Sequence, residues 1–113
     1  MSLADLRRDY IGQPLSESES EANPFTQFAR WFEQVRETEI DPTAMALATS
    51  TRDGRPSVRN VLLKGVDDRG FVFYTNYQSR KAREMEATGR ASLLFTWRSL
   101  ERQLGHKVRK FLR

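Results

Sequence analysis

Residues 44–51 read AMALATST, residues 57–64 read SVRNVLLK and residues 71–75 read FVFYT. Their apolar side chains follow a period of two or form short unbroken runs, which is typical of β-strands. Residues 52–56 (RDGRP) and 67–70 (DDRG) separate these stretches and are rich in turn-forming residues. We therefore predict three consecutive strands joined by tight turns.

A helix is predicted before the first strand. Asn23 is a favourable N-cap and Pro24 occupies the favoured first helical position. Asp41-Pro42 ends this helix in our interpretation, because the residue before a proline avoids the α region. The periodicity of 3.6 residues rests on Phe25, Phe28, Trp31, Phe32 and Val35.

A second helix and a fourth strand follow the third strand. Ser79 is predicted to cap a helix over residues 80–88, with Gly89 at its C-terminal end, and residues 90–97 (RASLLFTW) read as a strand. Antiparallel strands with one inserted helix favour an α+β fold, in which the sheet curls into a barrel.

The composition narrows the class of protein. The 113 residues, of 13.2 kDa, suffice for one domain, and 38% hydrophobic content suits a globular chain. The absence of cysteine and the single His106 exclude thiolate chemistry, catalytic triads and histidine-based metal clusters. Because there is no apolar run of membrane-spanning length and no secretory signal, we expect a cytoplasmic protein without a membrane partner.

Charge is distributed unevenly along the chain. Residues 1–50 carry 4 basic and 9 acidic side chains, whereas residues 51–113 carry 15 basic and 6 acidic ones. We divide the chain into an N-terminal arm (residues 1–22), a domain (23–103) and a basic tail (104–113). The basic half indicates an anionic partner or a solvated basic surface. Nucleic acid is disfavoured, because basic and aromatic residues do not interleave and no known module is recognisable.

One candidate anion site lies at the start of the second predicted helix. No glycine-rich phosphate loop is present, so a phosphate would depend on cationic side chains and a helix N-terminus. Arg80 and Lys81 follow the cap Ser79, where the helix dipole favours negative rather than positive charge. A bound anion would resolve this conflict; the alternative is a pair of solvated surface cations.

A second pair of cations, Arg59 and Lys64, brackets the apolar run VLL. Strict alternation places them on opposite faces of the strand, so a shared ligand requires a bulge, a twist or the strand's end at Lys64. Tyr74 and Thr75 lie where a strand meets a loop, and Gln103 lies in a polar segment after Trp97. Strand termination and an exposed polar turn are the alternative interpretations of these residues.

Six segments together resemble the N-terminal half of the pyridoxamine/pyridoxine 5′-phosphate oxidase family, the flavoenzymes of vitamin B6 metabolism. They occur in the family's order and extend over most of residues 4–103. The segments are LRRDY (6–10), NPFTQFARWF (23–32), DPTAMALAT (41–49), RNVLLKG (59–65), GFVFYTNYQSRKAREME (70–86) and SLLFTWRSLERQ (92–103).

This resemblance implies a homodimeric split β-barrel, an antiparallel and Greek-key-like fold, with FMN at the subunit interface. It implies a substrate-binding role for Lys64 and for an N-terminal segment that closes over the substrate, here Arg7, Arg8, Asp9 and Tyr10. The residues that it assigns to FMN are Arg59, Asn60, Val61, Leu62, Leu63, Lys64, Tyr74, Thr75, Arg80, Lys81 and Gln103.

The activity implied is oxidation of pyridoxamine or pyridoxine 5′-phosphate to pyridoxal 5′-phosphate, with O₂ as the acceptor. The cofactor supplies the redox chemistry, so no side chain is assigned a catalytic role and no metal is expected. Residues 104–113 (LGHKVRKFLR) show no counterpart of the family's C-terminal signature, and we expect a truncated product with impaired activity. The alternative is a non-catalytic FMN-binding or dimerisation fragment.

Overall fold

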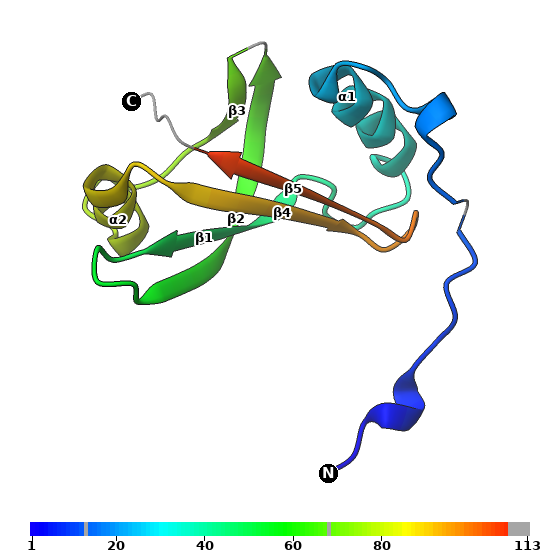
Figure 1. Ribbon diagram of the computed structural model, residues 1–113, viewed down its shortest axis with the longest axis horizontal. Helices are drawn as coiled ribbons and strands as arrows, with labels where there is room; N and C mark the ends of the chain where they lie inside the picture. The colour runs from blue at the N-terminus through cyan, green and yellow to red at the C-terminus, as the bar shows by residue number, and fades with distance from the viewer. Residues whose placement is uncertain (13, 68, 109–113) are drawn as a thin grey trace.

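The computed structural model describes residues 1–12, 14–67 and 69–108, which form one antiparallel sheet with two helices. Short 3₁₀ turns at Ala4–Leu6 and Glu17–Glu19 precede the domain. The strands lie in the order β3-β2-β1-β4-β5 (Figure 1), which confirms the predicted α+β class. The elements are α1 (Pro24–Val35), β1 (Ala44–Ser50), β2 (Pro56–Asp67), β3 (Gly70–Phe73), α2 (Arg80–Thr88), β4 (Ala91–Trp97) and β5 (Arg102–Val108).

Helix α1 begins as predicted and ends earlier than predicted. Asn23 Oδ1 accepts a hydrogen bond from the Phe25 amide, which is the expected N-cap. The helix ends at Val35 rather than near Asp41, and the Thr38 and Glu39 amides donate to the Val35 carbonyl in a turn. No apolar residue after Val35 continues the buried stripe, since Ile40 is fully exposed. Without that burial nothing offsets the cost of extending the helix.

The strand β5 was not predicted. Residues 102–108 (RQLGHKV) pair with β4 from Ala91↔Val108 to Trp97↔Arg102. The predicted domain boundary after Gln103 therefore falls inside a strand, and residues 109–113 of the predicted tail lie outside the described residues. His106 of β5 is half-buried, with its ring centroid 4.9 Å from that of Phe71.

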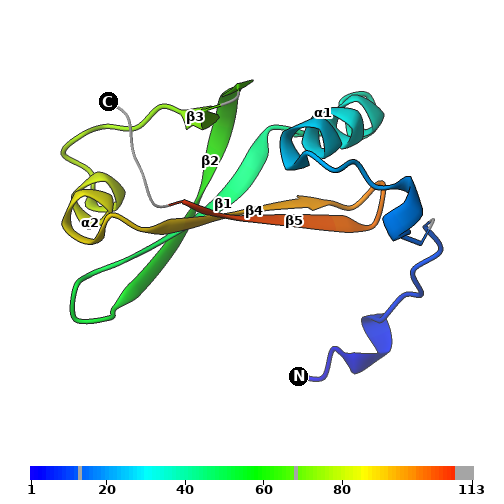
Figure 2. The ribbon, with the colours of Figure 1, turned by 45° about the horizontal axis from the view of Figure 1, so that its top comes forward.

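One face of the sheet carries the hydrophobic core. Phe28 of α1 is 3% exposed, and its ring centroid lies 4.9 Å from Phe71, 5.3 Å from Phe95 and 5.7 Å from Trp97. The same core includes Met85 of α2. Both helices therefore cover this face, at its opposite ends (Figures 1 and 2).

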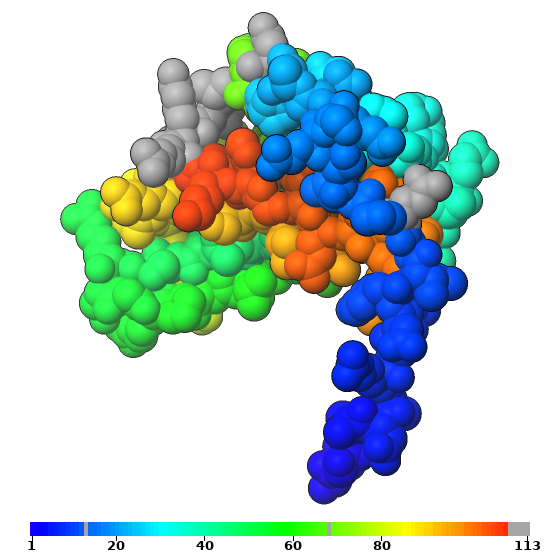
Figure 3. All heavy atoms as spheres, turned by 45° about the vertical axis from the view of Figure 1, so that its right-hand side comes forward, coloured from blue at the N-terminus to red at the C-terminus, as the bar shows by residue number. Residues whose placement is uncertain are grey.

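The other face of the sheet is open. Side chains that alternate with the core residues point outward, and Val58, Leu62 and Leu94 are 69%, 43% and 39% exposed. The N-terminal arm also projects from the body of the molecule (Figure 3). The radius of gyration is accordingly 16.1 Å, against about 13 Å for a compact domain of this length. The sheet is thus a half-barrel with one uncovered face.

Candidate functional site

The N-terminus of α2 has the geometry of an anion site. Ser79 Oγ accepts from the Ala82 amide at 3.3 Å, as predicted for an N-cap, and lies 3.3 Å from Thr75 Oγ1. Arg80 is exposed and Lys81 is half-buried. The first turn holds no acidic residue, and no described acidic side chain forms an ion pair with either cation. The positive charge of the helix dipole and of these two side chains is therefore uncompensated.

Arg59 of β2 is tied to this helix through two further side chains. Its Nη1 donates to the Leu47 carbonyl at 3.1 Å and to Thr49 Oγ1 at 2.7 Å. The Thr49 hydroxyl in turn donates to Glu84 Oε2 of α2. Thr49 and Glu84 are 4% and 6% exposed, so this chain of hydrogen bonds is shielded from water. Arg59 and the first two turns of α2 consequently belong to one cluster.

Lys64 lies at a β-bulge. The register of β2 against β3 shifts between Leu63↔Phe73 and Gly65↔Val72, which leaves Lys64 as the extra residue. A bulge was one of the conditions for Lys64 and Arg59 to meet one ligand. The alternation of burial along β2 nevertheless continues through the bulge, so Lys64 remains in the exposed set and Arg59 in the half-buried one.

The other β2 residues assigned to FMN divide in the same way. Asn60 and Leu62 belong to the exposed set, with Lys64. Leu63 is buried in the core and Val61 packs against it. The side chains of Val61 and Leu63 are therefore occupied by packing, and the Leu63 amide donates to the Thr43 carbonyl.

Tyr74 and Thr75 follow the end of β3, whereas Gln103 lies elsewhere. Tyr74 is 76% exposed, and Thr75 joins the Ser79 cap as described above. Gln103 is opposite Thr96, near the end of β4 that is remote from α2. Thr96 lies five positions along β4 from Ala91 at its start, which corresponds to about 17 Å of extended strand. Within one chain, Gln103 is thus not brought to the α2 cluster.

The four substrate-binding residues predicted in the arm are also remote from α2. Arg7, Arg8, Asp9 and Tyr10 are all exposed, and the arm leaves the sheet on the side away from α2 (Figures 1 and 2). The arm is attached at the turn between β4 and β5: the Gly12 amide donates to Glu101 Oε2 at 2.6 Å, and Arg8 Nη2 lies 3.6 Å from Glu101 Oε1.

Sequence reasoning missed Thr49, Glu84 and Glu101. Alternation from Leu47 already puts Thr49 on the buried face, and Glu84 lies between Ala82 and Met85 on the buried side of α2. Thr49 and Glu84 are polar residues at positions that the pattern assigns to the core. Buried polar groups need hydrogen-bond partners, so this position was a signal that both take part in a buried hydrogen-bond network. No signal of this kind marked Glu101, because its partners lie 89 and 93 positions earlier in the chain.

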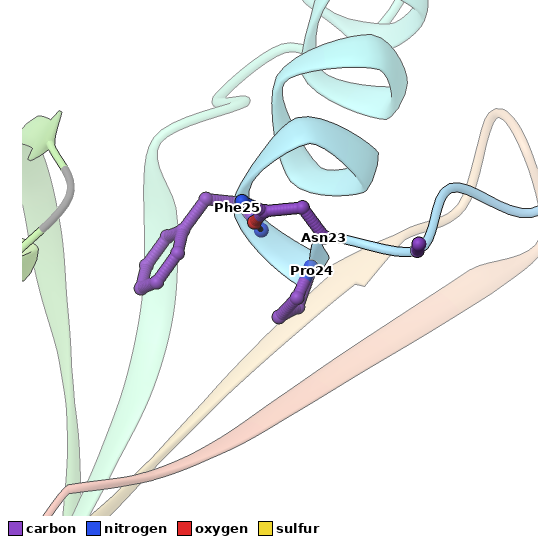
Figure 4. A pocket seen from close by; sticks show the side chains of 4 residues that line it. Asn23, Pro24 and Phe25 are labelled. Atoms are coloured by element: carbon purple, nitrogen blue, oxygen red, sulfur yellow. Dashed lines mark hydrogen bonds between the residues drawn. The ribbon is translucent and has the colours of Figure 1, made fainter.

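A separate hollow of about 680 Å³ lies at the start of α1 (Figure 4). It is lined by Ala22, Asn23, Pro24 and Phe25, none of which titrates or carries charge. In the described part of the chain no three acidic or histidine side chains gather as a metal site, and no helix is long and apolar enough to cross a membrane. The chemistry is concentrated at α2 and Arg59.

The electrostatic environment lowers the pKa of two carboxyl groups, both in turns away from this cluster. The pKa of Asp53 lies below 3.8 because Thr51 and Arg55 hydrogen-bond to its carboxylate. Arg69 lowers the pKa of Asp67 in the same way. These shifts are typical of exposed turns, and neither residue takes part in the candidate site.

Comparison with known solved structures supports the fold. PhzG from Burkholderia lata, solved with tetrahydrophenazine-1-carboxylic acid, superposes with a TM-score of 0.79 at 36% identity, over 85% of this chain and 49% of that one. A pyridoxamine 5′-phosphate oxidase-related, FMN-binding protein from Nostoc punctiforme gives a TM-score of 0.66 at 18% identity, over 75% of this chain and 46% of that one. The five strands therefore form half of a split barrel of this type.

Sequence comparison identifies the family. The chain is 55% identical to a pyridoxine/pyridoxamine 5′-phosphate oxidase of Trichormus variabilis over 91% of its length, and 57% identical to that of Rubrobacter xylanophilus over 90%. It spans about half of these relatives, 49% and 48%. The family model for pyridoxamine 5′-phosphate oxidase matches residues 31–110, and so continues past Gln103. The chain belongs to the pyridoxamine 5′-phosphate oxidase family.

Proposed function

We propose that this chain provides the FMN-phosphate-binding half of an enzyme that oxidises pyridoxamine or pyridoxine 5′-phosphate to pyridoxal 5′-phosphate with O₂. The observation that carries the proposal is the uncompensated positive charge at the capped N-terminus of α2, with Arg59 joined to the same helix. The family supports the identity of the cofactor, because one of the related proteins is described as FMN-binding.

The donors of this cluster fit a phosphomonoester. Among the described residues, Arg80 and Lys81 have no acidic partner, and Arg59 donates its hydrogen bonds through Nη1 alone. Arg59 Nε and Nη2 thus remain for a bidentate contact, the geometry that a guanidinium makes with phosphate. The backbone amides of the first turn of α2 add donors that favour an anion.

The chemistry of the reaction would come from FMN, which accepts a hydride from the substrate and is reoxidised by O₂. The residues of this chain bind and orient. Lys64 and Tyr74 are exposed near the end of β2 and after β3, where they are available to the flavin or to the substrate phosphate. The arm residues Arg7, Arg8, Asp9 and Tyr10 are proposed to close over the substrate, and Asn60, Leu62 and Thr75 to line the flavin.

A homodimer is part of this proposal. Gln103 is assigned to FMN by the resemblance, yet it lies at the end of β4–β5 remote from α2 in its own chain. A second copy can bring its Gln103 to the α2 cluster of the first. The exposed Val58, Leu62 and Leu94 give the open face of the sheet the apolar character of an association surface.

The test is a titration of FMN with the purified chain, followed by quenching of flavin fluorescence. We expect the double variant R80A/K81A to weaken binding about 100-fold, because it removes two charge-assisted contacts. The matched control K107A removes an exposed lysine of β5 and leaves the affinity unchanged. An absence of quenching by the wild-type chain, or equal binding by R80A/K81A, contradicts the proposal.

The second candidate function is FMN binding without catalysis. It is favoured by one observation: among the described residues the donors of α2 and Arg59 lie together, whereas Gln103 and the exposed arm residues are not brought to them. Measurement of peroxide after addition of pyridoxine 5′-phosphate separates the two functions. Stoichiometric quenching without peroxide supports the non-catalytic module, whereas quenching with peroxide and pyridoxal 5′-phosphate supports the oxidase.

A further inference from the structure

Glu84 is a buried carboxylate to which the proposed function gives no task. It is 6% exposed on α2, and its carboxylate accepts a hydrogen bond from the Thr49 hydroxyl. Burying a carboxylate is costly unless hydrogen bonds or an opposite charge compensate it. The positive charge joined to it by hydrogen bonds is Arg59, which donates to the same hydroxyl oxygen.

The Thr49 hydroxyl connects the two charged groups in a defined direction. A hydroxyl has one hydrogen to donate, whereas a carboxylate only accepts, so the hydrogen points to Glu84. The lone pairs of Thr49 Oγ1 are then directed to the Arg59 guanidinium, which donates to them at 2.7 Å. Glu84 thereby fixes the rotation of the hydroxyl, and the hydroxyl fixes one nitrogen of Arg59.

This arrangement leaves the rest of the guanidinium for a ligand. Nη1 is held by Thr49 and by the Leu47 carbonyl, which sets the plane of the group. Nε and Nη2 have no described protein partner. Glu84 lies one helical turn from Arg80, about 6 Å along the helix axis. Through Thr49, Arg59 is thus joined to the second turn of the helix whose first turn carries the proposed phosphate-binding cations.

We propose that Thr49 and Glu84 are positioning residues, which orient the Arg59 guanidinium so that its Nε and Nη2 bind the FMN phosphate. This inference rests on the proposed FMN site. It assigns a role to two residues that are not among those proposed to contact FMN. Pre-ordering a flexible arginine raises affinity because the entropy of ordering it is lost before the ligand binds.

Titration of FMN with three variants of the full chain tests the inference. We expect T49V, which removes the hydroxyl at nearly constant shape, to weaken binding about tenfold, the effect of one to two lost hydrogen bonds. T49S keeps the hydroxyl and is expected to bind within about twofold of wild type. The control T26V removes a threonine hydroxyl from the exposed side of α1 and leaves the affinity unchanged.

A double-mutant cycle separates positioning from a general structural role. If Thr49 acts through Arg59, T49V has no further effect on FMN affinity in the R59A background. Equal weakening by T49V in the wild-type and R59A backgrounds overturns the inference, as does wild-type affinity in T49V. Variant E84Q is expected to act like T49V, because its amide can donate to Thr49 and compete with Arg59.

A measurement without FMN distinguishes failure of this inference from failure of the proposed function. We expect the ¹⁵N–¹H signals of the Arg59 side chain to be resolved and slowly exchanging in the free wild-type chain, and to be lost in T49V. If the wild-type chain does not bind FMN, the proposed function is wrong, and these signals still decide whether Thr49 orders Arg59. Signals that are alike in both chains overturn the positioning role.

Discussion

Glu101 combines an unfavourable backbone conformation with two contacts to the N-terminal arm. Among the described non-glycine residues it alone has positive φ, at +54°. That conformation costs an L-residue about 1–2 kcal/mol. Its side chain, 10% exposed, binds the Gly12 amide and lies beside Arg8. A Cβ at position 12 would approach Glu101 Oε2 and the Leu100 carbonyl at 3.1 Å, so Gly12 permits this close contact.

The variant E101G separates these two effects. Glycine relieves the positive φ, so E101G should lose about 1 kcal/mol less free energy of unfolding in urea than E101A, which loses the same contacts and keeps the positive φ. The Gly12 amide loses its acceptor, and its hydrogen exchange should become as fast as that of an unprotected amide. E101Q, which keeps a side-chain oxygen, is the control and should retain the protection. A slow Gly12 amide in E101G would show that Glu101 does not hold the arm.

The pKa of the Asp53 carboxyl depends on hydrogen bonds from two neighbouring residues. The Thr51 hydroxyl, 2.5 Å from Asp53 Oδ1, is the largest cause that lowers the pKa of this carboxyl below 3.8, and Arg55 is the second. T51V should therefore raise the pKa of Asp53 toward 3.8, as measured by NMR titration of the carboxyl carbon. The pKa of Asp67, lowered by Arg69, is the internal control and should not move.

The lowered pKa of Asp53 determines how this group changes the stability of the fold with pH. The folded chain binds the proton of Asp53 less readily than the unfolded chain, so the stabilisation is complete above pH 3.8 and is lost as the pH falls through the lowered value. T51V should consequently flatten the acid limb of the stability curve. An unchanged pKa of Asp53 in T51V would contradict the assignment of the shift to this hydroxyl.

At the scale of elements, α2 depends on its cap. Ser79 accepts from the Ala82 amide, and no acidic residue in the first turn shares the task. We expect S79A to lower the free energy of unfolding by about 1 kcal/mol in urea denaturation. S92A changes an exposed serine of β4 and should shift it by less than about 0.5 kcal/mol. Equal effects of the two substitutions would contradict the capping role.

Helix α1 is held to the sheet chiefly by the aromatic cluster around Phe28. This ring contacts Phe71, Phe95 and Trp97, whereas Phe25 at the helix start is only half-buried. F28A should cost about 3–5 kcal/mol, because it leaves a cavity that rigid neighbours cannot fill. F25A, the matched control, should cost clearly less in the same urea denaturation. A smaller loss in F28A than in F25A would place the anchor of α1 elsewhere.

The elements were predictable where one local pattern determines them. Alternation of apolar residues identified β1, β2, β3 and β4, and the caps Asn23 and Ser79 identified both helix starts. Strand β5 was missed because its burial alternates only between half-buried and exposed. Two of its four half-buried positions are polar, the four being Arg102, Leu104, His106 and Val108. Contact with α1, which is distant in sequence, partly covers Arg102: its guanidinium carbon lies 4.7 Å from the centre of the Trp31 ring.

At the scale of the whole molecule, the candidate site was predictable in part. The cap and cations of α2 follow from helix physics alone, and the bulge at Lys64 was one of the options that spacing left open. The link from Arg59 to Glu84 was not predictable, since it depends on packing α2 against β1. The positions of Gln103 and the arm, away from α2, were not predictable either, because sequence order does not determine which parts of an open sheet meet.

The open face of the sheet is the surface through which we propose that copies of the chain associate. Cross-strand pairs Ala48↔Val58, Ala44↔Leu62 and Ala46↔Leu94 join the exposed apolar side chains into one strip across β2, β1 and β4. Small alanines in the middle of the strip let another surface approach closely. Burying such a strip removes apolar area from water, which is the main driving force of association.

Substitution of lysine on this strip should therefore dissociate the proposed dimer. We expect the double variant V58K/L94K to raise the dissociation constant at least tenfold in sedimentation equilibrium, because two ammonium groups would be buried without partners. The control T26K places one lysine on the exposed side of α1 and should sediment like wild type. A wild-type chain that remains monomeric at every concentration, or a V58K/L94K dimer as tight as wild type, contradicts association through this face. In either case the Gln103 of a second copy could not reach the α2 cluster by this route, and a different surface would have to bring the two ends of the site together.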